Sequence, residues 1–228
     1  MKKNTAIFLA LIFIFIIGLT AILIKNTSQP FKTAESGKLM VAASFYPLYF
    51  MSVQIGGAKA EVINIIPAGA EPHDYEPTAK DMAKMENSRL IVLNGGGLEA
   101  WSGNLKKNID AGQTTIIEAS AEIRPTNIDP HVWLDPRLAQ KMVNKITQGF
   151  EQVDSLNKDY YKANANALKS KLNSLDIAYE QGLANCAEKN IITSHAAFGY
   201  LAAAYGFKQI PITGLSPDAE PSPAELAN

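Results

Sequence analysis

The sequence contains three histidines, and each lies beside prolines or small residues rather than on an apolar helical face. They are His73 in AEPHDYEPT, His131 in DPHVWLDP and His195 in ITSHAAFGY. Neutral imidazole binds zinc at roughly 2.0–2.1 Å, and three histidines with a carboxylate or a water complete a tetrahedral site. A single histidine is more often a surface residue or a satisfied polar group. Three such settings together favour a metal site, although their spacing alone does not establish one.

Segments that alternate between strand and helix separate these histidines. Short apolar runs predict strands at LMVAAS, Val62–Pro67, Arg89–Gly95 and Thr114–Ser120, with one helix starting near Pro47 and another in TAKDMAKMEN. This alternation predicts an α/β fold with a largely parallel sheet. Ligands of such sheets bind beyond the carboxyl ends of the strands. The long separations between the histidines agree with successive βα units whose strand ends converge.

A long helix is predicted from Lys158 to Asn185. Its apolar residues recur at steps of four, three, four and four, at Leu168, Leu172, Leu175, Tyr179 and Leu183. At 1.5 Å per residue, a helix of some 25 residues is about 38 Å long, which is enough to link two lobes. Strand signals resume at Asn190–Thr193 and in FKQIPI, on either side of a helical HAAFGYLAAAYG. We therefore predict a first lobe at 39–157, a linking helix at 158–185 and a second lobe at 186–228.

The predicted second lobe is short. Residues 190–228 number 39, below the roughly 50 residues that a domain with its own core needs. At the end of the sequence, Ser222 and Pro223 predict an N-cap and first turn that open a helix. We therefore expect the second lobe to be incomplete and the sequence to be a C-terminally truncated version of a longer protein.

The first residues have a different character from the rest. Lys2 and Lys3 precede an uncharged, apolar run of 19 residues, Ala6–Ile24. At 1.5 Å per residue this run reaches close to the roughly 30 Å of a bilayer core. We predict a membrane anchor at 1–25 followed by a linker at 26–38, with a cleaved signal segment as the alternative, although the cleavage site looks poor. Both place the remainder outside the cytoplasm. The only cysteine, Cys186, lies far from this run, so lipid attachment there is not expected.

The composition excludes one class of function and one motif. With 21 basic and 22 acidic side chains, a net charge of −1 and no basic run, the chain gives no reason to expect nucleic-acid binding. The glycines at Gly95–Gly97 follow a predicted strand but lack the spacing of a phosphate-binding loop, so they predict a turn. Trp101 and Trp133 are expected to pack in the core or to line the cleft.

From about Leu39 to its last residue, the chain resembles the zinc- and manganese-binding solute-binding proteins of ABC importers (cluster A-I, also called cluster 9). The motifs that carry the resemblance occur in the family's order and spacing: SFYPLYFMSVQIGG, INIIPAGAEPHDYEPTAKDMAKMENSRLIVLNGGGLEAW, DPHVWLDPR, ITSHAAFGYLAAAYGF and PITGLSPDAEPSPAEL. The resemblance implies two α/β lobes joined by one rigid helix, with a metal buried between the lobes.

The resemblance also assigns the ligands and the partner. His73 and His131 match two ligands of the first lobe, and His195 matches the first ligand of the second lobe. The family's fourth ligand is an aspartate or glutamate later in the second lobe, with which nothing in this sequence aligns. The expected protein is a monomer that delivers its metal to an ABC permease and catalyses no reaction.

The choice of metal follows from the ligands. Imidazole suits zinc, whereas oxygen-rich sites suit manganese. In the family resembled, a glutamate at the third ligand position goes with manganese, and this chain has His195 there. Zinc is therefore favoured. Manganese stays the alternative, because the chain lacks the histidine-rich loop that zinc-binding relatives often carry before the second ligand.

Two further functions and several carboxylates remain open. A zinc hydrolase would also use three histidines, with water at the open position and a nearby general base. Cell-surface adhesion is supported only by the predicted anchor. Asp74 and Glu76 beside His73, and Asp129 and Asp135 beside His131, could orient the ligand rings. Helix or turn caps are the alternative that we favour for these carboxylates.

Overall fold

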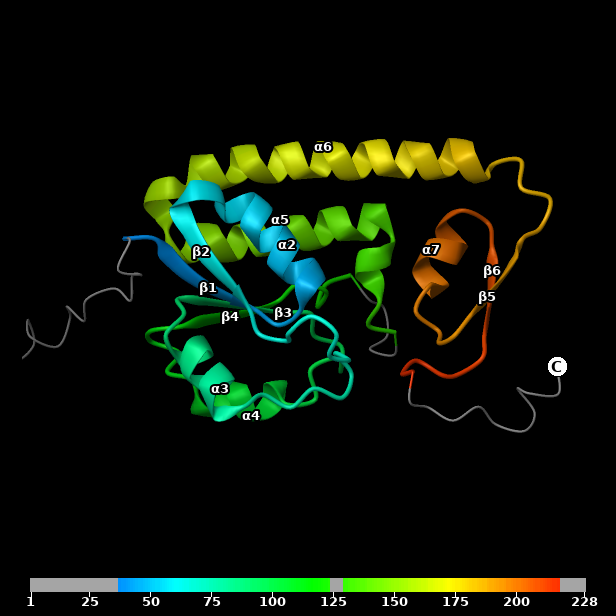
Figure 1. Cartoon of the computed structure of the whole chain (residues 1–228). Helices are drawn as coiled ribbons and strands as arrows, with labels where there is room; N and C mark the ends of the chain where they lie inside the picture. Colours follow the sequence, from blue (N-terminus) through cyan, green and yellow to red (C-terminus); the bar gives the residue numbers. More distant parts are fainter. Residues whose placement is uncertain (1–36, 124–128, 218–228) are drawn as a thin grey trace, which may run out of the picture. The chain divides into compact units, whose positions relative to one another are not determined.

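The computed structural model describes residues 37–123 and 129–217 (Figure 1). All of the elements reported below lie in one compact unit, Lys32–Asn228. The predicted anchor at Ala6–Ile24 and the predicted helix start at Ser222 lie outside the described residues. Within residues 37–123 and 129–217, no helix is both long enough and apolar enough to cross a membrane.

A four-stranded parallel sheet forms the first part of the fold. Its strands, in the spatial order β2-β1-β3-β4, are β1 (Leu39–Ala43), β2 (Ala60–Asn64), β3 (Leu90–Leu93) and β4 (Thr115–Glu118). In this register Ala43 pairs with both Asn64 and Val92. Because all four strands run in the same direction, their carboxyl ends lie at one edge of the sheet. The predicted α/β fold with a parallel sheet is confirmed.

Strand β2 differs from the predicted Val62–Pro67, because it both begins and ends earlier. The apolar run nevertheless continues past the strand, since Ile65 and Ile66 are 2% and 3% exposed. Their amides donate to the carbonyls of Ala43 and Ser44, each at 2.9 Å. The chain thus stays beside β1 after the strand ends, and an apolar pattern alone does not separate these two situations.

Helices cover both faces of the sheet (Figure 1). The helices of one face are α2 (Tyr46–Gly56) and α5 (Pro136–Val153), with α6 (Lys158–Leu183) packed on their outer side, and those of the other are α3 (Ala79–Glu86) and α4 (Ser102–Asn108). Successive strand residues point to opposite faces. Accordingly Val41 and Leu90 pack in the first cluster, whereas Ala42 and Ile91 pack in the second. This double cover explains why the two central strands, β1 and β3, are continuous apolar runs.

Local sequence determines where two of these helices begin. Thr78 and Asp81 form a capping box at α3, in which each side chain accepts a hydrogen bond from the other residue's backbone amide. Asp135 is the N-cap of α5, and its carboxylate accepts from the backbone amide of Arg137 at 2.8 Å. The capping role that we favoured for Asp135 is therefore observed.

Helix α6 is buried along only part of its length. Its bounds, Lys158–Leu183, end two residues before the predicted end. Tyr161 and Leu168 in its first half are 0% and 3% exposed, whereas Leu175 in its second half is 44% exposed. The predicted apolar face is therefore fully buried only in the first half of the helix, although the partly buried Leu172 also packs against the core.

Beyond α6, β5 (Asn190–Thr193) and β6 (Lys208–Pro211) form a separate parallel pair connected through α7 (Gly199–Ala204). Helix α7 is shorter than the predicted HAAFGYLAAAYG. The reason lies in the preceding turn, where the amide of Ala196 donates to the carbonyl of Gly214 at 2.8 Å instead of entering a helix. The short 3-10 turns of the described residues are η1 (Gly57–Lys59), η2 (Val132–Leu134) and η3 (Ser155–Asn157).

Candidate metal centre

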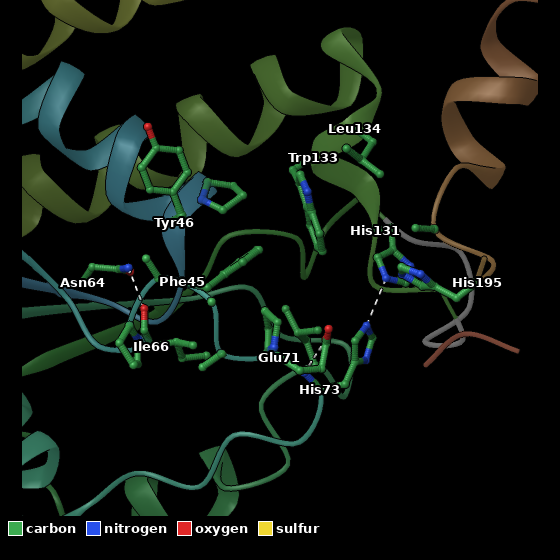
Figure 2. Close-up of a pocket in the computed structure, with 18 of the residues that line it drawn as sticks. Phe45, Tyr46, Asn64, Ile66, Glu71, His73, His131, Trp133, Leu134 and His195 are labelled. Atoms are coloured by element: carbon green, nitrogen blue, oxygen red, sulfur yellow. Dashed lines mark hydrogen bonds between the residues drawn. The ribbon is translucent and has the colours of Figure 1, made fainter. Parts of the chain in front are cut away.

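Each of the three predicted ligands follows a strand of a parallel sheet. His73 lies in the loop after β2, His131 lies immediately before η2 in the connection from β4 to α5, and His195 lies in the turn between β5 and α7. The structure brings all three rings together, with His195 facing the other two (Figure 2). The expectation that the strand ends converge is therefore met at this site.

The spacing of the ring nitrogens suits a single ion. One nitrogen from each ring lies within 4.8 Å of the other two, and among the described residues these histidines form the only group of this kind. Nε2 of His73 and Nε2 of His131 are 3.1 Å apart. Two nitrogens bound to one tetrahedral zinc at roughly 2.0–2.1 Å are about 3.3 Å apart. The geometry of this pair is therefore close to that of a zinc site.

The ring of His131 is held by a neighbouring carboxylate. Oδ1 of Asp129 accepts the backbone amide of His131 at 2.9 Å and lies 2.8 Å from its Nδ1. A carboxylate at Nδ1 favours the tautomer with the proton on that nitrogen, which leaves the lone pair of Nε2 free for a metal. His131 itself is only 2% exposed. Asp129 thus makes the orienting contact that the sequence left open.

A second acidic residue has a similar position that the sequence analysis missed. Glu71 precedes His73 by two residues, as Asp129 precedes His131, with a proline between them in both cases. Oε1 of Glu71 accepts the backbone amide of His73 at 3.2 Å. The repeated acid-Pro-His pattern was the signal that could have identified it. For Asp74 and Glu76, a cap stays the favoured prediction and an orienting role the alternative.

The loop that carries His131 is also fastened to the sheet. Asn94, at the end of β3, donates from its side-chain amide to the carbonyl of Pro130 at 3.0 Å. The backbone amides of Asn94 and Gly95 donate to the buried carboxylate of Glu99 at 2.7 and 2.9 Å. The glycines at 95–97 have φ angles of 79°, 70° and 87°, so the predicted turn is present and requires glycine. This turn and Glu99 hold Asn94 where its side-chain amide can bind the loop that carries His131.

Two of the histidines have lowered pKa values. For both His73 and His195 the main cause is burial, and the nearby His131 adds a second lowering effect because two cations would repel each other. Both rings are therefore largely neutral at pH 7. A neutral imidazole has the free lone pair that a metal requires.

An apolar cavity of about 420 Å³ adjoins the three rings. Its lining includes Phe45 and Trp133 (Figure 2). Leu98 and Phe198 also line it. Trp133 lies between the core and the site, with its ring 4.7 Å from that of Phe45 and 5.2 Å from that of His131, between centroids. Trp101 packs instead in the cluster between the sheet and helices α3 and α4. The two tryptophans thus fulfil the two roles that we expected.

Comparison with known proteins adds independent information. The family model for zinc-uptake complex component A, periplasmic, matches residues 41–228. The high-affinity zinc uptake system protein ZnuA of Bacillus subtilis is 40% identical over 213 residues, which cover 85% of this chain and 67% of that protein. The zinc-binding lipoprotein AdcA of Streptococcus pneumoniae is 36% identical over an aligned length of 252 residues. The alignment covers all of this chain but only 47% of AdcA, so the chain spans about half of that relative's length.

Solved structures agree with these relationships. The Zn(II)-bound ZnuA-like domain of S. pneumoniae AdcA matches with a TM-score of 0.74 and 42% identity, over 84% of this chain and 73% of that one. The laminin-binding protein Lmb of Streptococcus agalactiae, described as having adhesin and metal transporting activity, matches with a TM-score of 0.76 and 34% identity, over 83% of this chain and 73% of Lmb. The chain therefore belongs to the ZnuA family, the periplasmic zinc-uptake components.

Proposed function

We propose that this chain captures zinc outside the cytoplasm with His73, His131 and His195 and passes the ion to the permease of an ABC importer. The observation that carries the proposal is the convergence of three ring nitrogens within 4.8 Å at the carboxyl ends of three strands. The zinc uptake and zinc binding named for the related ZnuA and AdcA support it.

Zinc is favoured over manganese by the chemistry of these donors. Three imidazole nitrogens form a nitrogen-rich site, whereas manganese prefers carboxylate, carbonyl and water oxygens. In the Irving–Williams order, a nitrogen site also binds zinc more tightly than manganese. We therefore propose that the site binds zinc more tightly than manganese.

Capture differs from catalysis in what it requires of the site. A zinc hydrolase needs a general base placed against a metal-bound water. Here Asp129 is engaged with the ring and backbone of His131, and Glu71 is engaged with the backbone of His73. The hydrogen bonds of these two carboxylates thus serve the ligands rather than a reacting water. We propose that the chain binds and releases its ion without chemical turnover.

The proposed location follows from the N-terminal sequence and the family. The family component is described as periplasmic, and AdcA is named a lipoprotein. The only cysteine of this chain is Cys186, so we propose that the apolar run Ala6–Ile24 anchors it. The protein should then stay in the membrane fraction, and mass spectrometry should find Met1–Ile24 still attached. A mature N-terminus between Ala21 and Gly37 would contradict the anchor.

Competition titration with a chromophoric chelator tests the binding proposal. The chain is expected to bind one zinc ion, and His131→Ala is expected to lose most of that affinity. Asp159→Ala is a suitable control, because Asp159 is an exposed carboxylate in the first turn of α6. Equal zinc affinity of the His131 variant and the control would show that the ion binds elsewhere. Tighter binding of manganese than of zinc would contradict the choice of metal.

The same preparations test the absence of catalysis. The zinc-loaded chain is expected to show no hydrolysis of ester or phosphoester substrates above the level of free zinc. Turnover that depends on zinc and disappears in His131→Ala would favour the hydrolase over the transport component.

A further inference from the structure

Three elements meet at a polar junction away from the histidines. The hydroxyl of Tyr205, at the end of α7, donates to Oδ1 of Asp176 in α6 at 2.7 Å. The guanidinium carbon of Arg137, in the first turn of α5, lies 5.6 Å from the centre of the Tyr205 ring. Nε of Arg137 lies 4.0 Å from Oδ1 of Asp176. One residue from each of the three helices therefore contributes to this junction.

The junction joins the segment that carries His195 to the segment that follows His131. Arg137 is bound through its side chain to Asp135, the N-cap of α5, with a distance of 3.1 Å from Nη2 to Oδ2. At the other end of α7, the hydroxyl of Tyr200 donates to the carbonyl of Asp129 at 3.2 Å. Helix α7 is thus attached near both of its ends to parts of the fold outside the β5–β6 pair.

The position of His195 follows that of α7 and the β5–β6 pair. The carbonyl of His195 accepts from the side-chain amide of Gln209 in β6 at 3.0 Å and from the hydroxyl of Thr193 in β5 at 2.8 Å. The main chain of His195 is therefore fixed to these strands. Whatever places this small assembly against α6 also places His195 against the other two rings.

Apolar contact with the rest of the fold comes mainly from two partly buried tyrosine rings: Tyr200 packs against the main core, and the ring of Tyr205 lies 5.2 Å from that of Tyr179 in α6. Between Asn190 and residue 217, the buried hydrophobic side chains of the described residues are those of Ala197 and Ala202, both small. Burial of apolar area stabilises the folded state by about 25 cal/mol per Å², so two small alanine side chains contribute little to its stability. A hydrogen bond between a hydroxyl and a carboxylate is stronger than one between neutral groups. The bond from Tyr205 to Asp176 therefore adds a directional contact to these ring contacts, and replacing Tyr205 by Phe removes that bond while keeping the ring beside Tyr179.

We propose that Tyr205 is a positioning residue for the metal ligand His195, acting through its hydrogen bond to Asp176. The inference rests on the proposed zinc site. In this arrangement Tyr205 touches neither the ion nor a ligand. Its contribution to zinc affinity is made entirely through His195, and this gives the proposal a specific experimental signature.

A double-mutant cycle in the 228-residue chain measures that signature. Tyr205→Phe removes the hydroxyl and keeps the ring, and we expect zinc affinity to fall roughly threefold to tenfold, as for loss of one hydrogen bond. In a His195→Ala background the same substitution is expected to change zinc affinity less than about twofold, because the ligand it positions is gone.

The chain offers a closely matched control. The hydroxyl of Tyr161, at the other end of α6, donates to Asp154 at 2.6 Å, so it makes the same kind of bond within the first part of the fold. Tyr161→Phe is expected to leave zinc affinity unchanged, even where thermal unfolding shows that it lowers stability. A loss of zinc affinity in Tyr161→Phe equal to that in Tyr205→Phe would overturn the proposal, since any destabilisation would then have the same effect.

The remaining outcomes separate this inference from the proposed function. Unchanged affinity in Tyr205→Phe, or an equal loss with and without His195, would overturn the positioning role alone. Unchanged zinc affinity in His195→Ala would overturn the assignment of that ligand, and the positioning role with it. A cycle in which Tyr205→Phe weakens binding only when His195 is present would support both.

Discussion

The region around the four-stranded sheet and the region of β5, α7 and β6 are built in different ways. All four residues of β3 are fully buried, whereas Ile192 in β5 is 74% exposed and Ile210 in β6 is 42% exposed. Two ligand segments are attached to the first region, and the third belongs to the second. The comparison shows that one metal site can combine ligands on a densely packed platform, the region of strands β1–β4 and the helices around them, with a ligand on a segment that buries few side chains.

The largest expected difference between the regions is in stability. Ile146 on α5 is fully buried in the main core, so Ile146→Ala should lower the free energy of unfolding by about 2–5 kcal/mol. Ile192→Ala should change it by less than about 0.5 kcal/mol, because an exposed side chain leaves little cavity. Urea denaturation of both variants provides the measurement. Comparable losses would mean that Ile192 is buried in solution and that the contrast between the regions is wrong.

The ligands should differ in the same direction. Loss of a residue that orients a ligand typically lowers metal affinity 10- to 100-fold, so loss of the buried ligand in His131→Ala should lower it by at least about 100-fold. His195→Ala should lower it by about 10-fold, because binding must first order the weakly packed segment that carries it. Zinc competition titration of the two variants ranks them. A greater loss for His195→Ala would show that the second region is as well ordered as the first.

Sequence patterns predicted the strands of both regions and the long helix better than the turns, and β5 was predicted at its observed bounds, Asn190–Thr193. Strands buried on both faces leave continuous apolar runs, and a long helix leaves a periodic face, so β3 and α6 were predicted within two residues of their observed ends. The exposure of Leu175 in α6 was not predictable, because periodicity shows which face is apolar and not what covers it. The turn before α7 depends on contacts with Gly214, which lie beyond local propensity.

The same distinction applies to the site. Residue type and setting were enough to propose the three histidines. Glu71 was missed because its role is carried by a backbone contact, and such contacts leave no signature in side-chain chemistry beyond the acid-Pro-His pattern. The tether from Tyr205 to Asp176 joins residues from two separate helices, and no local pattern indicates such a pair.

The two acid-Pro-His segments offer a comparison within the platform itself. Asp129→Ala should lower zinc affinity by about 10-fold, because the ring of His131 loses the group that orients it. Glu71→Ala should lower it less than about threefold, since Glu71 is exposed and its hydrogen bond goes to the backbone of His73 rather than to the ring. Zinc titration of both variants under identical conditions measures the two losses of affinity. Equal losses would show that the backbone contact positions its ring as firmly as the direct one.

The smallest expected effect concerns pH, and it tests whether the two regions close on each other in solution. A proton and zinc compete for the same lone pair, so affinity falls as the histidines become protonated. Burial and the neighbouring His131 lower the pKa values of His73 and His195 below their usual 6.5, so both rings are already neutral above that pH. Zinc affinity should therefore change less than about threefold between pH 8 and pH 7, and should fall once the pH drops below the lowered pKa values.

If the second region spent much of its time away from the platform, His195 would lose both causes of its shift and its pKa would return toward 6.5. NMR titration of the three imidazole rings in the metal-free chain would detect that return, and a pKa of 6.5 or higher for His195 would contradict the arrangement described for the second region.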